Sequence, residues 1–104
     1  MLQFNYENQV AVVTGGTRGI GRAITTRYLE SGATVYAIYR SNEEAANKFK
    51  EELGALGENL KLAKLDVCDY SACEAFFNDL GDQDIHILVN NSGIRRDNLL
   101  LMMK

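Results

Sequence analysis

The residues best suited to chemistry in this sequence are four glycines, Gly15, Gly16, Gly19 and Gly21, which directly follow the apolar run 10–13. Glycine allows backbone to approach a ligand where a Cβ would collide, and the first N–H groups of a helix lack intrahelical partners. A glycine cluster between a strand and a helix is therefore suited to holding a phosphate group. Gly15, Gly19 and Gly21 have the spacing GxxxGxG, which is one residue wider than the GxGxxG dinucleotide pattern. The alternative is a glycine-rich turn that binds nothing.

Other reactive side chains form no recognisable catalytic or metal-binding group. Cys68 and Cys73 have a spacing that fits neither a CxxC redox site nor the usual zinc pairs, so we expect two free thiols. His86 lies in the apolar run 85–89 without the partners of a charge relay, and we expect it to face solvent or a neighbouring residue. The sequence therefore predicts no metal site.

Composition excludes several classes of partner. The chain has 104 residues, of which 24% are charged, and a net charge of -3, which argues against nucleic acid and anionic lipid as ligands. No apolar run approaches the ~20 residues needed to span a bilayer, and residues 1–7 lack the basic start and apolar block of a signal peptide. We expect one domain, located in the cytoplasm and not bound to membrane.

Alternating apolar runs and amphipathic stretches position these residues. The continuous run 10–13 is typical of a strand covered on both faces, whereas two lysines in 60–65 indicate a strand near a sheet edge. Helical spacing of apolar residues predicts a helix in each interval between strands. The predicted strands cover 10–13, 34–39, 60–65 and 85–89.

Local signals predict where the helices begin and end. The second and third helices follow Ser-x-x-Glu capping boxes, Ser41 with Glu44 and Ser71 with Glu74, and a further helix starts in 95–98. Glycines that follow the last apolar position mark the expected ends: Gly32, Gly54 or Gly57, and Gly81.

The element order β-α-β-α-β-α-β predicts an α/β fold with parallel strands and right-handed crossovers. We expect a Rossmann-type doubly wound sheet with strand order 3-2-1-4, truncated after the fourth strand. Ligands of such folds bind outside the carboxyl ends of the strands, where the order reverses. Polar or glycine clusters fall at these ends, at 15–21, at Arg40, at 66–67 and at 90–93. Residues 1–104 are therefore expected to be the amino-terminal dinucleotide-binding part of a Rossmann domain.

The same residues resemble the short-chain dehydrogenase/reductase family, through TGGTRGIG at 14–21, Asp-Val at 66–67 and NNSG at 90–93. Within it, GIRRDNLL at 93–100 is similar to GITRDNLL of the 3-oxoacyl-[acyl-carrier-protein] reductases, and acetoacetyl-CoA reductases are similar there. Ser92 replaces the alanine most often found in NNAG. Because the change adds one hydroxyl and little volume, we expect it to be tolerated.

The resemblance implies a set of cofactor contacts. Residues 15–20 would cover the pyrophosphate and adenosine ribose, and Gly21 would pack the helix against the strand. Asp66 and a backbone group of Val67 would meet the adenine, Asn91 would border the cofactor ribose, and Asn90 would tie neighbouring strands together. The implied cofactor-binding residues are Gly15, Gly16, Thr17, Arg18, Gly19, Ile20, Gly21, Arg40, Asp66, Val67, Asn91, Ser92 and Gly93.

The residue after the second strand indicates which dinucleotide is preferred. An NAD site places a carboxylate there to accept from the ribose 2′-OH, whereas a 2′-phosphate requires a cation. This chain has Arg40 at that position and Arg18 in the glycine loop, and guanidinium groups bind phosphate well. The sequence predicts NADPH (NADP+), the alternative for Arg40 being a solvated charge at a strand end.

The resemblance fails at the catalytic residues. The family uses a Ser, a Tyr and a Lys in a Tyr-x-x-x-Lys arrangement, and none of the five tyrosines here has a lysine four residues later. We expect the chain alone to be inactive, because reduction of a carbonyl needs a positioned general acid.

Two hypotheses remain open. The chain is the amino-terminal fragment of an NADPH-dependent reductase of 3-oxoacyl thioesters, whose substrate is carried by acyl-carrier protein or coenzyme A. Alternatively, it is an autonomous nucleotide-binding or structural module that self-associates. If the 104-residue chain is stable, the uncovered edge beside the fourth strand predicts a homo-oligomer, because exposed edges pair with other chains.

Overall fold

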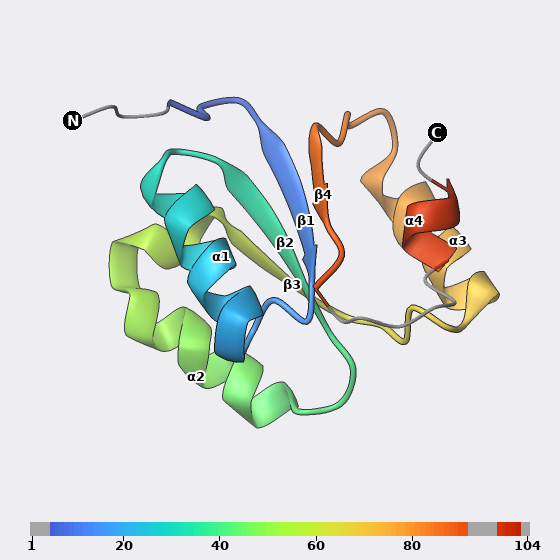
Figure 1. Ribbon diagram of the computed structural model, residues 1–104, viewed down its shortest axis with the longest axis horizontal. Helices are drawn as coiled ribbons and strands as arrows, with labels where there is room; N and C mark the ends of the chain where they lie inside the picture. The colour runs from blue at the N-terminus through green and yellow to red at the C-terminus, as the bar shows by residue number, and fades with distance from the viewer. Residues whose placement is uncertain (1–4, 92–97, 103–104) are drawn as a thin grey trace.

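The computed structural model describes residues 5–91 and 98–102 of the chain (Figure 1). One four-stranded parallel sheet has the order β3-β2-β1-β4, which confirms the predicted Rossmann-type topology. The strands are β1 Val10–Thr14, β2 Thr34–Tyr39, β3 Leu60–Lys64 and β4 Ile87–Val89. The helices are α1 Gly19–Glu30, α2 Glu43–Leu53, the 3-10 helix η1 Gly54–Asn59, α3 Tyr70–Leu80 and α4 Asn98–Met102.

Strand β1 lies at the centre of the sheet, and all five of its residues are buried. In its parallel pairing with β2, Val10 lies opposite Thr34, and in its parallel pairing with β4, Ala11 lies opposite Ile87. Strand β3 pairs only with β2, so the lysine-containing strand forms one edge as predicted, and β4 forms the other edge of the described sheet. This arrangement brings the carboxyl ends of β1, β2 and β3 to one rim.

Helices cover the two faces of the sheet separately, with α1 and α2 on one face and α3 and α4 on the other (Figure 1). Alternate residues of each strand therefore enter different cores. The core under α1 and α2 consists of Ala11, Val13, Leu29, Ala33, Val35, Ala37, Phe49 and Leu60. The core under α3 and α4 consists of Val12, Ile38, Leu65, Val67, Cys73 and Leu99.

The two predicted capping boxes are wrong. Asn42, not Ser41, caps α2, because its Oδ1 accepts from the Ala45 N–H at 3.0 Å. Asp69, not Ser71, caps α3, and its carboxylate accepts from the Ala72 N–H at 3.1 Å. Asn, Asp and Ser cap helices about equally well, so the path of the chain out of the preceding loop decides which one is used.

Glycines end the helices as predicted, each with a left-handed backbone that closes the last turn. Of the two candidates for the end of α2, the structure selects Gly54. The glycines, with their φ angles, are Gly32 (94°), Gly54 (59°) and Gly81 (62°).

Strand β4 begins two residues later than predicted, yet His86 extends its attachment to β1. The His86 N–H donates to the Val10 carbonyl at 2.9 Å, and the Val10 N–H donates to His86 Nδ1 at 3.0 Å. This confirms that the histidine faces a neighbouring residue. Cys68 is exposed and Cys73 is buried, and neither forms a disulfide in the described part of the chain.

The fourth predicted helix is observed as α4, while residues 95–97 lie outside the described residues. Within the described part of the chain, no helix has the length and hydrophobicity needed to cross a membrane.

Candidate functional site

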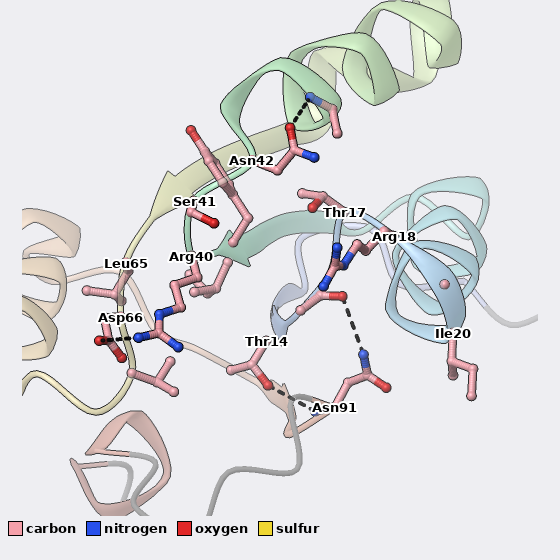
Figure 2. Close-up of a pocket in the computed structure, with 16 residues that line it drawn as sticks. Thr14, Thr17, Arg18, Ile20, Arg40, Ser41, Asn42, Leu65, Asp66 and Asn91 are labelled. Atoms are coloured by element: carbon pink, nitrogen blue, oxygen red, sulfur yellow. Dashed lines mark hydrogen bonds and ion pairs between the residues drawn. The ribbon is translucent and has the colours of Figure 1, made fainter.

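A groove of about 450 Å³ lies at the carboxyl ends of β1, β2 and β3, where the sequence predicted a ligand (Figure 2). It is walled by the start of α1 on one side and by the residues that follow β2 and β3 on the other. Predicted site residues that line it are Gly15, Thr17, Arg18, Gly19, Ile20, Arg40, Asp66, Val67 and Asn91. Ser92 and Gly93 lie outside the described residues.

Two of the predicted glycines, Gly16 and Gly21, do not line the groove but bring α1 close to the sheet. A Cβ on Gly16 would lie 2.9 Å from both Thr25 Oγ1 and the Val13 carbonyl. The Thr25 hydroxyl donates to the Gly16 carbonyl at 3.0 Å, which fixes the loop to the helix. A Cβ on Gly21 would collide with the Gly15 carbonyl and lie 2.6 Å from Asn91 Nδ2. These glycines therefore allow α1 to lie close to the sheet and support the groove without lining it.

The start of α1 faces the groove without a side-chain cap. Arg18 occupies the N-cap position in an extended conformation, and its side chain makes no capping hydrogen bond. No acidic residue lies in the first turn, so the partial positive charge of the helix start is not neutralised locally. The exposed Arg18 guanidinium adds a full charge at the same place. This combination is suited to an anion such as a pyrophosphate.

The opposite wall carries a second arginine with an acidic neighbour. Arg40 follows β2, and its Nη2 lies 3.7 Å from Asp66 Oδ2, which follows β3. The other oxygen of Asp66 accepts from the Cys68 N–H at 2.9 Å, so the turn after β3 holds the carboxylate in place. In Figure 2, Arg40 extends toward Asp66, while Arg18 approaches from the α1 side. The groove thus has a cationic group on each wall.

Thr14 fixes the end of β4 to the glycine loop, a role that the sequence interpretation missed. Its hydroxyl, which is fully buried, accepts from the Asn91 N–H at 2.9 Å and lies 3.3 Å from Asn90 Oδ1. Asn91 Nδ2 in turn donates to the Gly15 carbonyl at 3.3 Å. A polar residue ending an otherwise apolar buried run was the signal for this role.

Val67 contributes to the groove, but its carbonyl is already engaged. The backbone N–H of Asn98 donates to that oxygen at 2.9 Å, and Asn98 Nδ2 donates to it at 3.1 Å. Two donors use both lone pairs of a carbonyl, so a ligand meeting the Val67 backbone would have to use its N–H.

Tyr39 and its neighbours complete the lining and were not predicted as site residues. Burial and the nearby Glu43 carboxylate raise the pKa of the Tyr39 hydroxyl above its ordinary value, so this tyrosine stays protonated at neutral pH. Tyr39 forms part of the groove wall. The missed lining residues are Thr14, Ile38, Tyr39, Ser41, Asn42, Ala45 and Leu65.

The described residues also contain no cluster of three or more His, Cys, Asp or Glu side chains placed to hold a metal ion. The groove has hydrogen-bond donors and cations on two walls and apolar strand ends below them, an arrangement suited to an anionic ligand.

Known sequences are similar to this chain over most of its length. An acetoacetyl-CoA reductase from Paracoccus denitrificans is 46% identical over 91 residues, which are 86% of this chain and 36% of the relative. The 3-oxoacyl-[acyl-carrier-protein] reductase FabG of Vibrio harveyi is 46% identical over 102 residues, covering 96% of this chain and 40% of the relative. The chain thus spans well under half the length of these curated relatives.

Solved structures show the same fold. A short chain dehydrogenase from Burkholderia cenocepacia in complex with NADP superposes with a TM-score of 0.74 at 34% identity, covering 86% of this chain and 38% of that one. The Pseudomonas aeruginosa RhlG/NADP active-site complex gives a TM-score of 0.73 at 32% identity, covering 90% and 37%. The family described as short chain dehydrogenase matches residues 9–104. The chain therefore belongs to the short chain dehydrogenase family.

Proposed function

We propose that this chain holds the adenosine and pyrophosphate part of an NADP(H) site and forms the amino-terminal portion of a reductase of 3-oxoacyl thioesters. The observation that carries the proposal is the groove in which the uncapped start of α1, with Arg18, faces Arg40 across the strand ends. An arginine in place of a carboxylate after β2 favours a 2′-phosphate over a free 2′-hydroxyl. Two structures similar to this chain are NADP complexes, which supports the same assignment.

Each wall of the groove has a role in this proposal. The pyrophosphate lies against the N–H groups at the start of α1, and Arg18 and Arg40 neutralise phosphate charge from the two sides. Asp66 accepts from the adenine amino group, and the Val67 N–H donates to the ring, since the Val67 carbonyl is occupied. Asn91, which lines the groove, borders the cofactor ribose.

The substrate class rests on the relatives. A 3-oxoacyl-[acyl-carrier-protein] reductase and an acetoacetyl-CoA reductase both act, by their names, on 3-oxo thioesters. When bound, NADPH supplies the hydride for such a reduction. The described residues of this chain bind and orient the cofactor, and none of the five tyrosines in the sequence has the lysine four residues later that the family's catalytic arrangement uses. We therefore expect cofactor binding without turnover from the 104-residue chain.

Charge reversal at Arg18 tests the proposal. The Arg18→Glu variant should bind NADP+ about tenfold more weakly or worse in isothermal titration calorimetry, because a charge-assisted hydrogen bond contributes about 1.5–3 kcal/mol. Arg27→Glu is the matched control: it makes the same charge change on the same helix, outside the groove lining. Affinity that falls equally in both variants, or in neither, would contradict a phosphate site at the start of α1.

A self-associating module is the second candidate, because apolar surface is exposed beside β4. Ile87, Leu88 and Val89 are only half-buried at the sheet edge. An apolar groove of about 410 Å³ runs along α1, lined by Tyr6, Ile20, Ile24 and Tyr28 among others, and Ile20 is 74% exposed. We expect a dimer or larger species in light scattering at micromolar concentration. A monomer under these conditions would contradict self-association but would leave nucleotide binding intact.

A further inference from the structure

We infer that Asp66 limits the preference of this groove for a 2′-phosphate by competing with the phosphate for Arg40. This inference rests on the proposed NADP(H) function. It starts from the contact between the two side chains, Arg40 Nη2 to Asp66 Oδ2 at 3.7 Å, inside the groove that both residues line. A cation that would meet the 2′-phosphate is thus already turned toward a carboxylate (Figure 2).

The two partners are not equally free to move. One oxygen of Asp66 accepts from the Cys68 N–H at 2.9 Å, and the Asp66 carbonyl accepts from the Asp69 N–H at 2.9 Å. These bonds hold Asp66 within the turn that leads into α3. Arg40 has a side chain that is 74% exposed. Binding of a 2′-phosphate would therefore move the Arg40 side chain away from Asp66, while Asp66 stays in place.

The contact is weak enough to be displaced. It is a single long approach, not a bidentate pair, and exposed ion pairs of this kind shift an equilibrium by only about two- to fivefold. A phosphate with two negative charges is a stronger partner for a guanidinium. The ion pair therefore lowers the affinity for a 2′-phosphate without preventing its binding.

Direct repulsion between the Asp66 carboxylate and a 2′-phosphate also lowers the affinity for that phosphate. A carboxylate within ion-pair distance of Arg40 also lies near the position that the 2′-phosphate would take, and like charges repel. A ligand with a free 2′-hydroxyl experiences neither the competition nor the repulsion. Asp66 should therefore reduce the preference for a 2′-phosphate over a free 2′-hydroxyl. Any contact of Asp66 with adenine affects both ligands equally and cancels in the ratio of their affinities.

The experiment measures that ratio. Dissociation constants for 5′-AMP and 2′,5′-ADP are determined by calorimetry for the wild-type chain, for Asp66→Asn, for Arg40→Gln and for the double variant. Asparagine keeps the Oδ1 acceptor for Cys68 and removes the charge. In Asp66→Asn, the ratio of the 5′-AMP constant to the 2′,5′-ADP constant should rise about two- to fivefold. The ratio should rise less when Asp66→Asn is added to Arg40→Gln, because without Arg40 the substitution removes only the repulsion between Asp66 and the 2′-phosphate.

Asp79→Asn serves as the charge control, since Asp79 is exposed on α3 and does not line the groove, and its ratio should match the wild type. A ratio that stays constant or falls in Asp66→Asn, while Arg40→Gln lowers it, would overturn the inference and leave the proposed function standing. A wild-type chain that binds neither ligand would overturn both. The NADP(H) assignment would also be overturned if the wild-type chain bound 5′-AMP and 2′,5′-ADP with equal affinity and Arg40→Gln left both affinities unchanged.

Discussion

Alanine at position 21 is expected to lower the free energy of unfolding by about 3 kcal/mol or more, the upper range for added atoms in a packed interior. The new Cβ would collide with the Gly15 carbonyl and lie 2.6 Å from Asn91 Nδ2. The carbonyl belongs to the backbone and cannot rotate away, and Asn91 Nδ2 already donates to it. Urea denaturation followed by circular dichroism measures the loss.

Gly19→Ala is the matched control, because it adds the same methyl group two residues earlier at the start of the same helix. No atom lies within 4 Å of the Cβ that it would add, so only the left-handed backbone at φ 57° opposes the substitution. That strain costs about 1–2 kcal/mol. Gly21 has no positive φ, so its loss reports the collision and not backbone strain. A loss in Gly21→Ala no larger than that in Gly19→Ala would contradict the close approach of α1 to the loop.

The contrast between these glycines shows how far the sequence could predict the site. The glycine cluster after an apolar strand was sufficient to predict a loop between β1 and α1 that lines a groove. The residues alone could not separate glycines that turn the chain or line the groove from Gly16, which packs against backbone, whereas the family resemblance had implied the packing role of Gly21. That distinction depends on the distance between a helix and a strand, which spacing alone does not encode.

The sheet was predictable because its rules are general. Alternation of strands and helices implies parallel pairing with one handedness, and two lysines in β3 indicated its position at an edge. Helix starts were less predictable, since Ser41 and Asn42 have similar capping preferences and the fold decides between them.

Most contacts between strand ends could not be predicted, although the family resemblance implied that Asn90 ties neighbouring strands together, and its Oδ1 accepts from the Thr14 hydroxyl at 3.3 Å. The hydrogen bond from the Asn91 N–H to Thr14 Oγ1 joins residues 77 positions apart, and the Arg40–Asp66 pair joins the ends of two different strands. Side-chain direction at such ends depends on the relative positions of several elements. The sequence therefore predicted separate ligand contacts for Arg40 and Asp66 but not the contact between their side chains.

Arg40→Asp should have the largest effect on ligand choice, with NADP+ bound about 30-fold more weakly or worse and NAD+ affinity changed by less than about threefold. The substitution removes a guanidinium from the groove and places a second carboxylate near Asp66, so a 2′-phosphate loses a charge-assisted partner and meets added repulsion. A free 2′-hydroxyl loses less, because a carboxylate at this position can accept a hydrogen bond from it.

Lys64→Asp makes the same charge change at the exposed end of β3, outside the groove lining, and separates local recognition from the overall field. Calorimetric titration of both variants with NADP+ and NAD+ at one fixed salt concentration compares the four affinities, since phosphate binding depends on ionic strength. If Arg40→Asp weakened both dinucleotides equally, or if Lys64→Asp matched it, Arg40 would be a solvated charge at a strand end. Selective loss of NADP+ in Arg40→Asp alone is the result that a 2′-phosphate contact requires.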